Sequence, residues 1–305
     1  MITVAERAPY LPAVDRPRIT WPGDARIAVW VAPNIEHYEL TPPATSAGRD
    51  PWPRMPHPDV QQYAYKDYGN RVGTWRFADA CDDYGVRCTV SLNMAVMDHF
   101  PEIRDLIVER GWDVMSHGIY NTRYSYELSP EEEAAWLDDT IASLRRHTGR
   151  TLRGMLGPSI SATERTPDLM AERGLVYHAD WVHDDVPVPL RTETGRLCSV
   201  PYSIELNDVP LFGAHHDGAY FEQICRRQFD RLYAEGGKVM CLALHPYLIA
   251  QPHMIGHLRA VLRYITGHDG VWMATADEIA THYLDHHHDA DVTHARELAA
   301  ATKGA

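Results

Sequence analysis

Several features that mark large classes of protein are missing from this 305-residue chain. Its five cysteines are scattered and form no CxxC pair. An odd count at irregular spacing favours reduced, mostly buried thiols over a disulfide framework. No segment approaches the roughly 20 consecutive apolar residues that a membrane span needs. Neither a P-loop nor a GxGxxG pattern is present, so the sequence gives no support for nucleotide binding.

Basic residues are also fewer than acidic residues. Lys and Arg total 29 against 42 for Asp and Glu, which gives a formal net charge of -13 at pH 7. Nucleic acids and anionic membrane surfaces both need a basic face, so neither is expected as a partner. The first residues show no basic segment followed by an apolar stretch, so no signal peptide is expected. The sequence predicts a soluble, cytoplasmic protein.

The order of the predicted elements favours a single α/β domain over residues 26–283. About eight short apolar segments alternate there with about seven helical ones, which predicts parallel strands joined by crossover helices. That number of strands favours a complete or distorted (β/α) barrel over an open sheet. A capping box at Ser129 and Glu132, with Pro130 at the first helical position, predicts a long helix that ends near residue 147.

Three segments fall outside this alternation. Residues 1–25 are punctuated by prolines and predict an arm that wraps the domain or a neighbouring subunit, which suggests a homo-oligomer, either a dimer or a tetramer. Residues 40–66 are a proline-rich loop, which could form a lid or wall of the substrate site or could be a plain surface connection. Residues 284–305 are expected to be a peripheral, partly disordered tail, whose three consecutive histidines could scavenge metal.

Polar residues recur where the predicted strands end. These positions carry Asn34, Glu36, His37, Asn93, His117, Pro158, Asp180 and His245. The carboxyl ends of parallel strands meet at one edge of a sheet, and α/β enzymes build their active sites there. We therefore expect a shared cavity at this edge.

The best candidates for acid–base chemistry are Glu36 and His245. An imidazole titrates near neutrality, so His245 suits a general acid or a general base. Glu36 lies two residues after Asn34, so both side chains point the same way, the carboxylate as base or ligand and the amide as hydrogen-bond donor. The alternatives are a solvated carboxylate at a strand end and a histidine that is satisfied by a backbone carbonyl.

The remaining candidates could bind a metal or the substrate. His117 and Asn121 are four residues apart, which lets two ligands meet one ion, although an amide is a weaker ligand than an imidazole. Asp180 could orient a catalytic histidine, and Trp181 suits the wall of a pocket. The candidate substrate-binding residues are Asn121, Pro158, Ser159, Asp180 and Trp181.

Taken in order, these segments resemble the polysaccharide deacetylase superfamily. The resemblance rests on NIEHYEL, SHGIYN, RGMLGPSIS, ADWVHDD and ALHPYLIAQP. It is closest to the branch that includes cyclic imide hydrolases and allantoinase-like proteins. It implies a single-domain distorted (β/α) barrel that hydrolyses amide-type C–N bonds.

The catalytic positions of this family carry over unevenly. Its first motif supplies two aspartates, a base and a metal ligand, and Asn34 and Glu36 stand at the matching positions. Its pair of histidine ligands corresponds to His117 and Asn121, and its late general-acid histidine corresponds to His245. Since asparagine cannot take a proton, the resemblance implies a changed substrate and mechanism.

The sequence thus predicts an enzyme that opens a small cyclic amide or imide by attack of an activated water, with Glu36, His245, His117 and Asn34 as its catalytic residues. Glu36, His117 and Asn121 are the expected ligands if a divalent metal is bound, with zinc as the first candidate. A metal-independent reaction stays open, because catalytic zinc usually has three protein ligands. Two other functions stay open as well: metal-dependent N-deacetylation of an N-acetylated sugar or polysaccharide, and ligand binding without catalysis.

Overall fold

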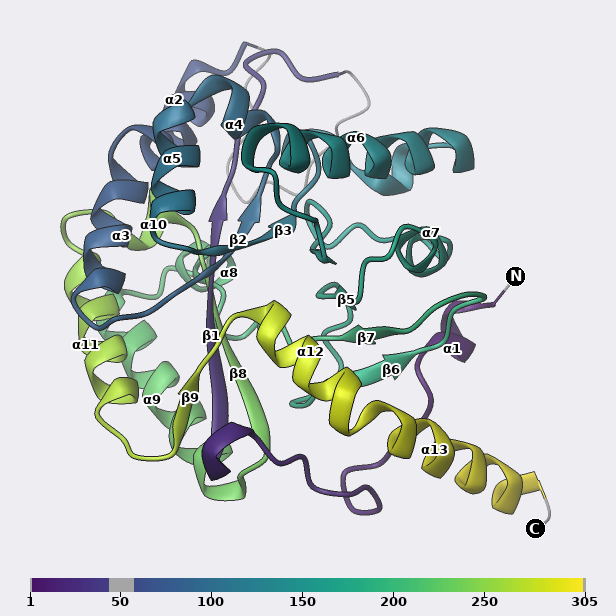
Figure 1. The fold of residues 1–305 in the computed structure, drawn as a ribbon. Coiled ribbons are helices and arrows are strands. Elements are labelled where there is room, and N and C mark those ends of the chain that lie inside the picture. Colours follow the sequence, from purple (N-terminus) through teal and green to yellow (C-terminus); the bar gives the residue numbers. More distant parts are fainter. Residues whose placement is uncertain (1, 44–57, 304–305) are drawn as a thin grey trace.

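The computed structural model describes residues 2–43 and 58–303, whose strands form one curled sheet (Figure 1). The strands are β1 (Ile27–Ile35), β2 (Thr89–Leu92), β3 (Asp113–Ser116), β4 (Gly154–Met155), β5 (Tyr177–His178), β6 (Val188–Leu190), β7 (Leu197–Ser199), β8 (Lys238–Leu244) and β9 (Val271–Met273). Their order is β6-β7-β5-β4-β3-β2-β1-β8, and β9 pairs with β1 off this path. Only the pair of β6 and β7 is antiparallel among the described strands. The predicted distorted barrel is thereby confirmed as a curled half-barrel in one domain.

β1 pairs with three other strands of this sheet, β2, β8 and β9. All nine of its residues are buried, as expected of a parallel strand that is covered on both faces and reads as a continuous apolar run. It pairs with β8 over residues 27–33, with β9 at its start and with β2 at its end. The end of β1 therefore delivers the next residue, Glu36, to the edge where the carboxyl ends of its neighbours meet.

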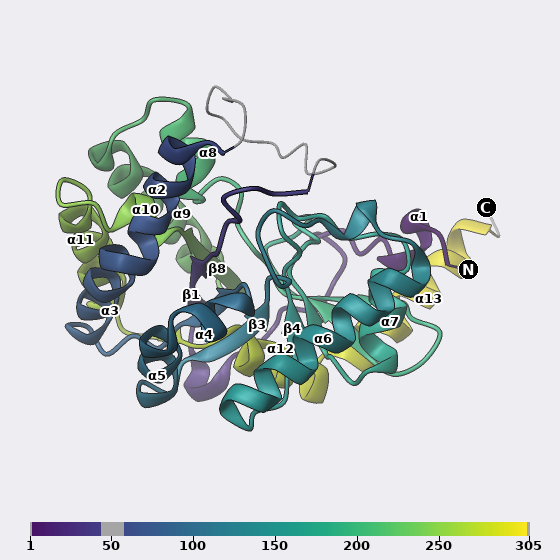
Figure 2. The ribbon, with the colours of Figure 1, turned by 90° about the horizontal axis from the view of Figure 1, so that it is seen from above.

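Helices surround the sheet, as Figure 2 shows from above. They are α1 (Val4–Arg7), α2 (Val60–Tyr68), α3 (Thr74–Asp82), α4 (Ala95–His99), α5 (Pro101–Glu109), α6 (Pro130–Thr148), α7 (Thr166–Glu172), α8 (Asp208–Gly213), α9 (Gly218–Glu235), α10 (Pro246–Ile249), α11 (Ile255–Thr266), α12 (Ala276–His286) and α13 (His288–Lys303). The capping box is confirmed: the Ser129 amide donates to Glu132 Oε2 at 2.8 Å, and the Glu132 amide donates to Ser129 Oγ at 3.3 Å.

A π-helical turn, Gly69–Gly73, joins α2 to α3 and lies against the segment that follows β8. A Cβ at Gly73 would approach the carbonyl oxygen of Pro246 to 2.2 Å, so only glycine lets the two backbones come this close. Within the same turn, Asn70 Nδ2 donates to the backbone oxygen of Glu36 at 2.9 Å. The turn thus fixes the backbone on both sides of the site.

Three of the expectations from the sequence need correction. Of the predicted 40–66 loop, residues 60–66 belong to helix α2, because the last proline of the segment precedes this helix; residues 44–57 lie outside the described residues. The predicted tail contains helix α13, which is held by the hydrogen bond from the buried Tyr283 hydroxyl to Asp291 Oδ2 at 2.7 Å. The pair of β6 and β7 is antiparallel, which corrects the expectation of parallel strands alone.

The N-terminal arm wraps its own domain. Arg7 is completely buried and donates to both carboxylate oxygens of Asp168, at 2.8 and 2.5 Å, while Arg16 pairs with Asp184 in the same way. Tyr10 between them stays exposed. The arm is therefore a built part of the domain, and the homo-oligomer stays a prediction.

Two further expectations can be compared with the structure. All five cysteines are buried and free, in agreement with the predicted thiols. No helix within residues 2–43 and 58–303 combines the length and the apolar character that crossing a membrane requires.

The buried ion pair of Arg7 gives a first prediction. Arg7→Ala leaves Asp168 without its partner, and breaking such a buried pair costs roughly 3 kcal/mol of unfolding free energy. Urea denaturation checks this value. Arg231→Ala, which removes an exposed pair with Glu235 on α9, is the matched control and should leave the unfolding midpoint unchanged. Equal midpoints for the two variants would contradict the assignment.

Candidate active site

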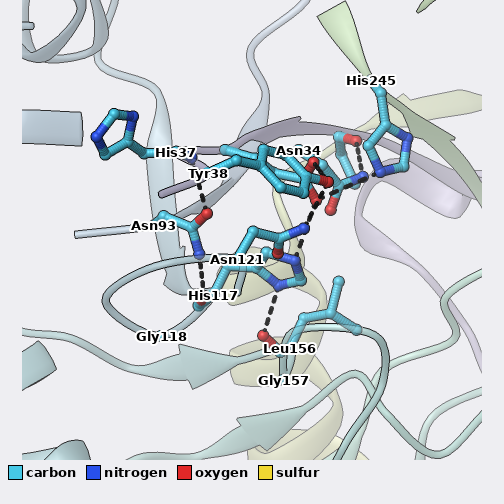
Figure 3. Close-up of polar contacts among 12 residues, drawn as sticks. Asn34, His37, Tyr38, Asn93, His117, Gly118, Asn121, Leu156, Gly157 and His245 are labelled. Carbon is cyan, nitrogen blue, oxygen red and sulfur yellow. Dashed lines mark hydrogen bonds and ion pairs between the residues drawn. The ribbon is translucent and has the colours of Figure 1, made fainter. Parts of the chain in front are cut away.

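The carboxyl ends of β1, β3 and β8 open into a cavity of about 700 Å³. Glu36 follows β1, His117 follows β3 and His245 follows β8, and all three line this cavity together with Asn34 and Asn121. Figure 3 shows how His117, His245, Asn34 and Asn121 lie. These side chains come from distant parts of the sequence and are nearly buried. The shared cavity that the strand endings predict is present.

Glu36 stands between the two histidines. Its Oε1 lies 3.3 Å from His117 Nε2 and 3.5 Å from His245 Nε2. Its other oxygen, Oε2, accepts a hydrogen bond from the Tyr38 hydroxyl at 2.7 Å. The carboxylate is thus oriented through both oxygens.

His245 is oriented by a second carboxylate, Asp208, at the start of α8. His245 Nδ1 lies 2.7 Å from Asp208 Oδ1, and the His245 amide donates to Asp208 Oδ2 at 2.8 Å. Asp208 is completely buried. A carboxylate in this position fixes the imidazole tautomer, with Nδ1–H on Asp208 and Nε2 turned toward Glu36.

The charges of this cluster follow from burial and from the mutual attraction of its members. Burial opposes the charged form of His245, but Glu36 and Asp208 outweigh it and raise the pKa of His245 to about 10. Burial also opposes the charged form of Glu36 and raises its pKa, but His245 and His117 lower this pKa by more than burial raises it. The pKa of Glu36 therefore lies well below the usual range of a carboxyl group. At neutral pH the site therefore holds an imidazolium at His245 and a carboxylate at Glu36.

His117 is held in place from two sides. Its Nδ1 lies 2.8 Å from the Leu156 carbonyl oxygen, so this nitrogen carries a hydrogen and Nε2 faces Glu36. Asn93 Nδ2 donates to the His117 backbone oxygen, and Asn93 Oδ1 accepts from the His37 amide at 2.9 Å. Asn93 and His37, two of the strand-end residues, therefore support the site from behind.

The two amides at the altered family positions make different contacts. Asn34 Nδ2 donates to the Tyr202 hydroxyl at 3.0 Å and to the Leu244 carbonyl oxygen at 3.2 Å. The Asn34 amide thus links β1 to Tyr202 and to the end of β8. Asn121 Nδ2 donates to the Tyr38 hydroxyl at 2.6 Å, while its buried Oδ1 has no hydrogen-bond partner within the described parts of the chain.

The later strand endings lie behind the cavity wall. Ser159 lines the cavity, whereas Pro158, Asp180 and Trp181 are not among the described residues that do so. Asp180 accepts hydrogen bonds from the amides of Gly157 at 2.8 Å and Ala162 at 3.0 Å and thereby holds the turn that carries Ser159. The carboxylate that orients His245 is Asp208 and not Asp180, which corrects that expectation.

Two residues of the site escaped the sequence reasoning. Asp208 follows no strand, and nothing in Asn207-Asp208-Val209 marks it as a partner of His245. Tyr38 could have been found, because it lies two residues beyond Glu36, as Glu36 lies two beyond Asn34. Only the folded arrangement shows that its hydroxyl joins Glu36 to Asn121.

The donor set around Glu36 falls short of a catalytic zinc site. Zinc of this kind usually has three protein ligands, and no group of three or more His, Cys, Asp or Glu that could hold a metal ion occurs within the described residues. Glu36 and His117 are two ligands of the usual types. His245 is committed to Asp208 as an imidazolium, and Asn121 offers only an amide oxygen.

The fold and this site together define a curled β/α half-barrel with a buried acid–base pair at the carboxyl ends of its strands. Comparison with known proteins gives a family match: residues 63–178 match the model of the polysaccharide deacetylase family. This stretch is thus a polysaccharide deacetylase domain, and the half-barrel fold is consistent with that superfamily, whose members hydrolyse amide-type C–N bonds.

Three relatives show how far the similarity extends. A Schizosaccharomyces pombe protein named "Putative polysaccharide deacetylase" is 27% identical over 85% of this chain and 91% of that protein. The crystal structure of a "probable Polysaccharide deacetylase" from Pseudomonas aeruginosa PAO1 superposes with a TM-score of 0.79 at 27% identity, over 89% of this chain and 95% of that one. The crystal structure of Puue allantoinase gives the same TM-score of 0.79 and the same coverage at 25% identity.

The raised pKa of His245 predicts how stability depends on pH. The folded state binds this proton more tightly than the unfolded state, so the stabilisation is complete below the ordinary histidine pKa of 6.5 and is lost as pH rises through about 10. The unfolding free energy of the wild type should therefore fall between pH 6.5 and 10. Measuring the unfolding free energy by denaturation at a series of pH values checks this. The unfolding free energy of His245→Gln should fall less over the same pH range. An equally steep decline in His245→Gln would assign it to another group.

Proposed function

We propose that this protein is a hydrolase that opens a small cyclic amide or imide by attack of an activated water. The observation that carries the proposal is the contact of the Glu36 carboxylate with the His245 imidazolium inside one cavity, which supplies a base and an acid next to each other. The similarity to an allantoinase over nearly the whole chain supports this substrate class.

Each catalytic step falls to a side chain of this chain. Glu36 accepts a proton from water, and the resulting hydroxide adds to the ring carbonyl carbon. The positive charge of His245 stabilises the developing oxyanion. His245 then gives its Nε2 proton to the leaving nitrogen as the ring C–N bond breaks, while Asp208 keeps the Nδ1 hydrogen and holds the ring in position. The proton on Glu36 then passes to the adjacent His245 Nε2, which restores the carboxylate and the imidazolium as the ring-opened product leaves.

A cyclic imide suits a site with these side chains. Its nitrogen lone pair is shared between two carbonyls, so each is more electrophilic than the carbonyl of a plain acetamide. The altered positions Asn34 and Asn121 bring neither a second base nor a full set of metal ligands. A more reactive carbonyl needs less assistance of either kind.

Removal of a sugar N-acetyl group is the second candidate. The similarity to proteins named as polysaccharide deacetylases over most of the chain favours it. The same acid and base would serve the same C–N bond chemistry on an acyclic acetamide. A binding protein without catalysis is the third candidate, because Asn34 occupies the position where the family carries its base.

The three candidates can be separated by a panel of substrates. We expect turnover of one or more of succinimide, dihydrouracil and allantoin, and none of a chitooligosaccharide, measured by product analysis. Turnover of the chitooligosaccharide alone would favour the deacetylase. Tight binding of one ring without turnover would favour the binding protein.

Substitution of the acid and the base tests the mechanism. His245→Ala and Glu36→Gln each remove one partner of the proton transfer, so kcat should fall by about 10² to 10⁴-fold while the fold is kept. His147→Ala, at a histidine of α6 that pairs with Asp98 on the surface, is the control and should match the wild type. Wild-type kcat in His245→Ala would remove this residue from the mechanism.

Metal removal gives a further test. Since the described donor set provides two ligands of the usual types, turnover should persist after dialysis against a chelator, and elemental analysis should find well below one equivalent of zinc. Loss of turnover that is restored by zinc would contradict this. In that case Glu36→Gln should also lower the metal content.

A further inference from the structure

We propose that Asn121 Oδ1 accepts an N–H of the substrate ring and that Tyr38 is the positioning residue that holds this oxygen in place. The inference rests on the proposed function and narrows its substrate class to cyclic amides and imides whose nitrogen carries a hydrogen. Asn121, which stands where the family has its second histidine ligand, would then select substrates that carry an N–H.

The orientation of the Asn121 amide is fixed by its neighbours. The Tyr38 hydroxyl has one hydrogen, and this hydrogen is directed to Glu36 Oε2 at 2.7 Å, because a carboxylate accepts hydrogen bonds. The Tyr38 oxygen is then left as an acceptor, so the group that faces it at 2.6 Å must be the Asn121 NH₂. With the amide reversed, two acceptors would meet. Oδ1 is therefore the atom that points away from Tyr38.

This oxygen is buried, held in place and unpaired. Asn121 is 7% exposed, and its backbone amide donates to the His37 carbonyl oxygen at 3.0 Å, which pins the residue. Oδ1 finds no hydrogen-bond partner among residues 2–43 and 58–303. A buried acceptor without a donor is costly, so such an atom on a cavity wall indicates a ligand that supplies the donor.

A second cavity-lining residue points to the same polarity. Gln62 on α2 lines the cavity, and its Oε1 is also buried without a partner in the described part of the chain. No buried nitrogen of a described cavity-lining side chain shares this property. The cavity therefore offers acceptors and calls for a ligand with N–H donors.

The place of Asn121 suits the nitrogen of the scissile bond. Tyr38 links the Asn121 amide directly to Glu36, the proposed base, so the amide lies near the proposed point of attack. In a lactam or imide, the nitrogen that carries this hydrogen is bonded to the carbonyl carbon under attack. As His245 protonates this nitrogen, its N–H becomes a stronger donor, so the hydrogen bond to Oδ1 strengthens toward the transition state. An N-methyl group would leave Oδ1 buried and unpaired.

The test compares succinimide with N-methylsuccinimide, and dihydrouracil with its 3-methyl derivative. The wild type should prefer the N–H member by about 10-fold to 100-fold in kcat/KM, which corresponds to one unpaired buried acceptor. Asn121→Leu should bring this ratio close to 1, mainly by slowing the N–H substrate. Tyr38→Phe frees the amide to turn and should lower the ratio as well, together with kcat for both substrates. Tyr233→Phe, which loses a hydroxyl contact to Asp269 far from the cavity, should keep the wild-type ratio.

The outcomes separate this inference from the proposed function. Turnover of both members at equal rates by the wild type, or an unchanged ratio in Asn121→Leu, overturns the inference and leaves the hydrolase standing. If no ring is turned over, calorimetric binding of the same pairs decides: a preference for N–H that Asn121→Leu abolishes supports the inference while the hydrolase fails. Loss of bound metal in Asn121→Leu at an unchanged ratio would make Asn121 a ligand instead.

Discussion

The buried contact between the Glu36 carboxylate and the His245 imidazolium is the interaction on which this site depends. Each group would be costly to bury as an isolated charge, and each keeps its charge because the other is near. Asp208 extends the cluster to three members and sets the tautomer of His245. The same attraction keeps Glu36 as a carboxylate and His245 as an imidazolium, so a proton acceptor and a proton donor stand side by side in the cavity.

The scaffold holds this pair by a small number of backbone constraints. β1 and β8 run side by side over residues 27–33 and 238–244, so Glu36 and His245 emerge from adjacent strands at the same edge. The π-turn closes over both of them, because Gly73 lets Pro246 approach and Asn70 holds the Glu36 backbone. Tyr38 then connects the pair to Asn121. Each functional side chain is thus fixed by an element that is distant in sequence.

Much of this arrangement could be predicted from the chain, and some of it could not. Continuous apolar segments that end on Glu36, His117 and His245 were enough to expect a parallel sheet with these residues at one edge, because the carboxyl ends of parallel strands coincide. Helix α2 was hidden by the prolines that precede it, and β6 by its shortness and its antiparallel pairing. Asp208 could not be anticipated, because it reaches His245 through a helix start that no strand pattern announces.

The sequence by itself determined the half-barrel, the positions of its strand ends and the acid–base residue types that they carry, since all of these are written in local periodicity and composition. The tertiary structure decided which of these residues act together. Hydrogen-bond direction and charge depend on neighbours that the fold brings in: Glu36 and Asp208 keep His245 protonated, Asp180 holds a loop, and Tyr38 orients the Asn121 amide so that its buried Oδ1 has no partner in the described part of the chain. Contacts of this kind join residues that are far apart in the sequence, so no local pattern encodes them.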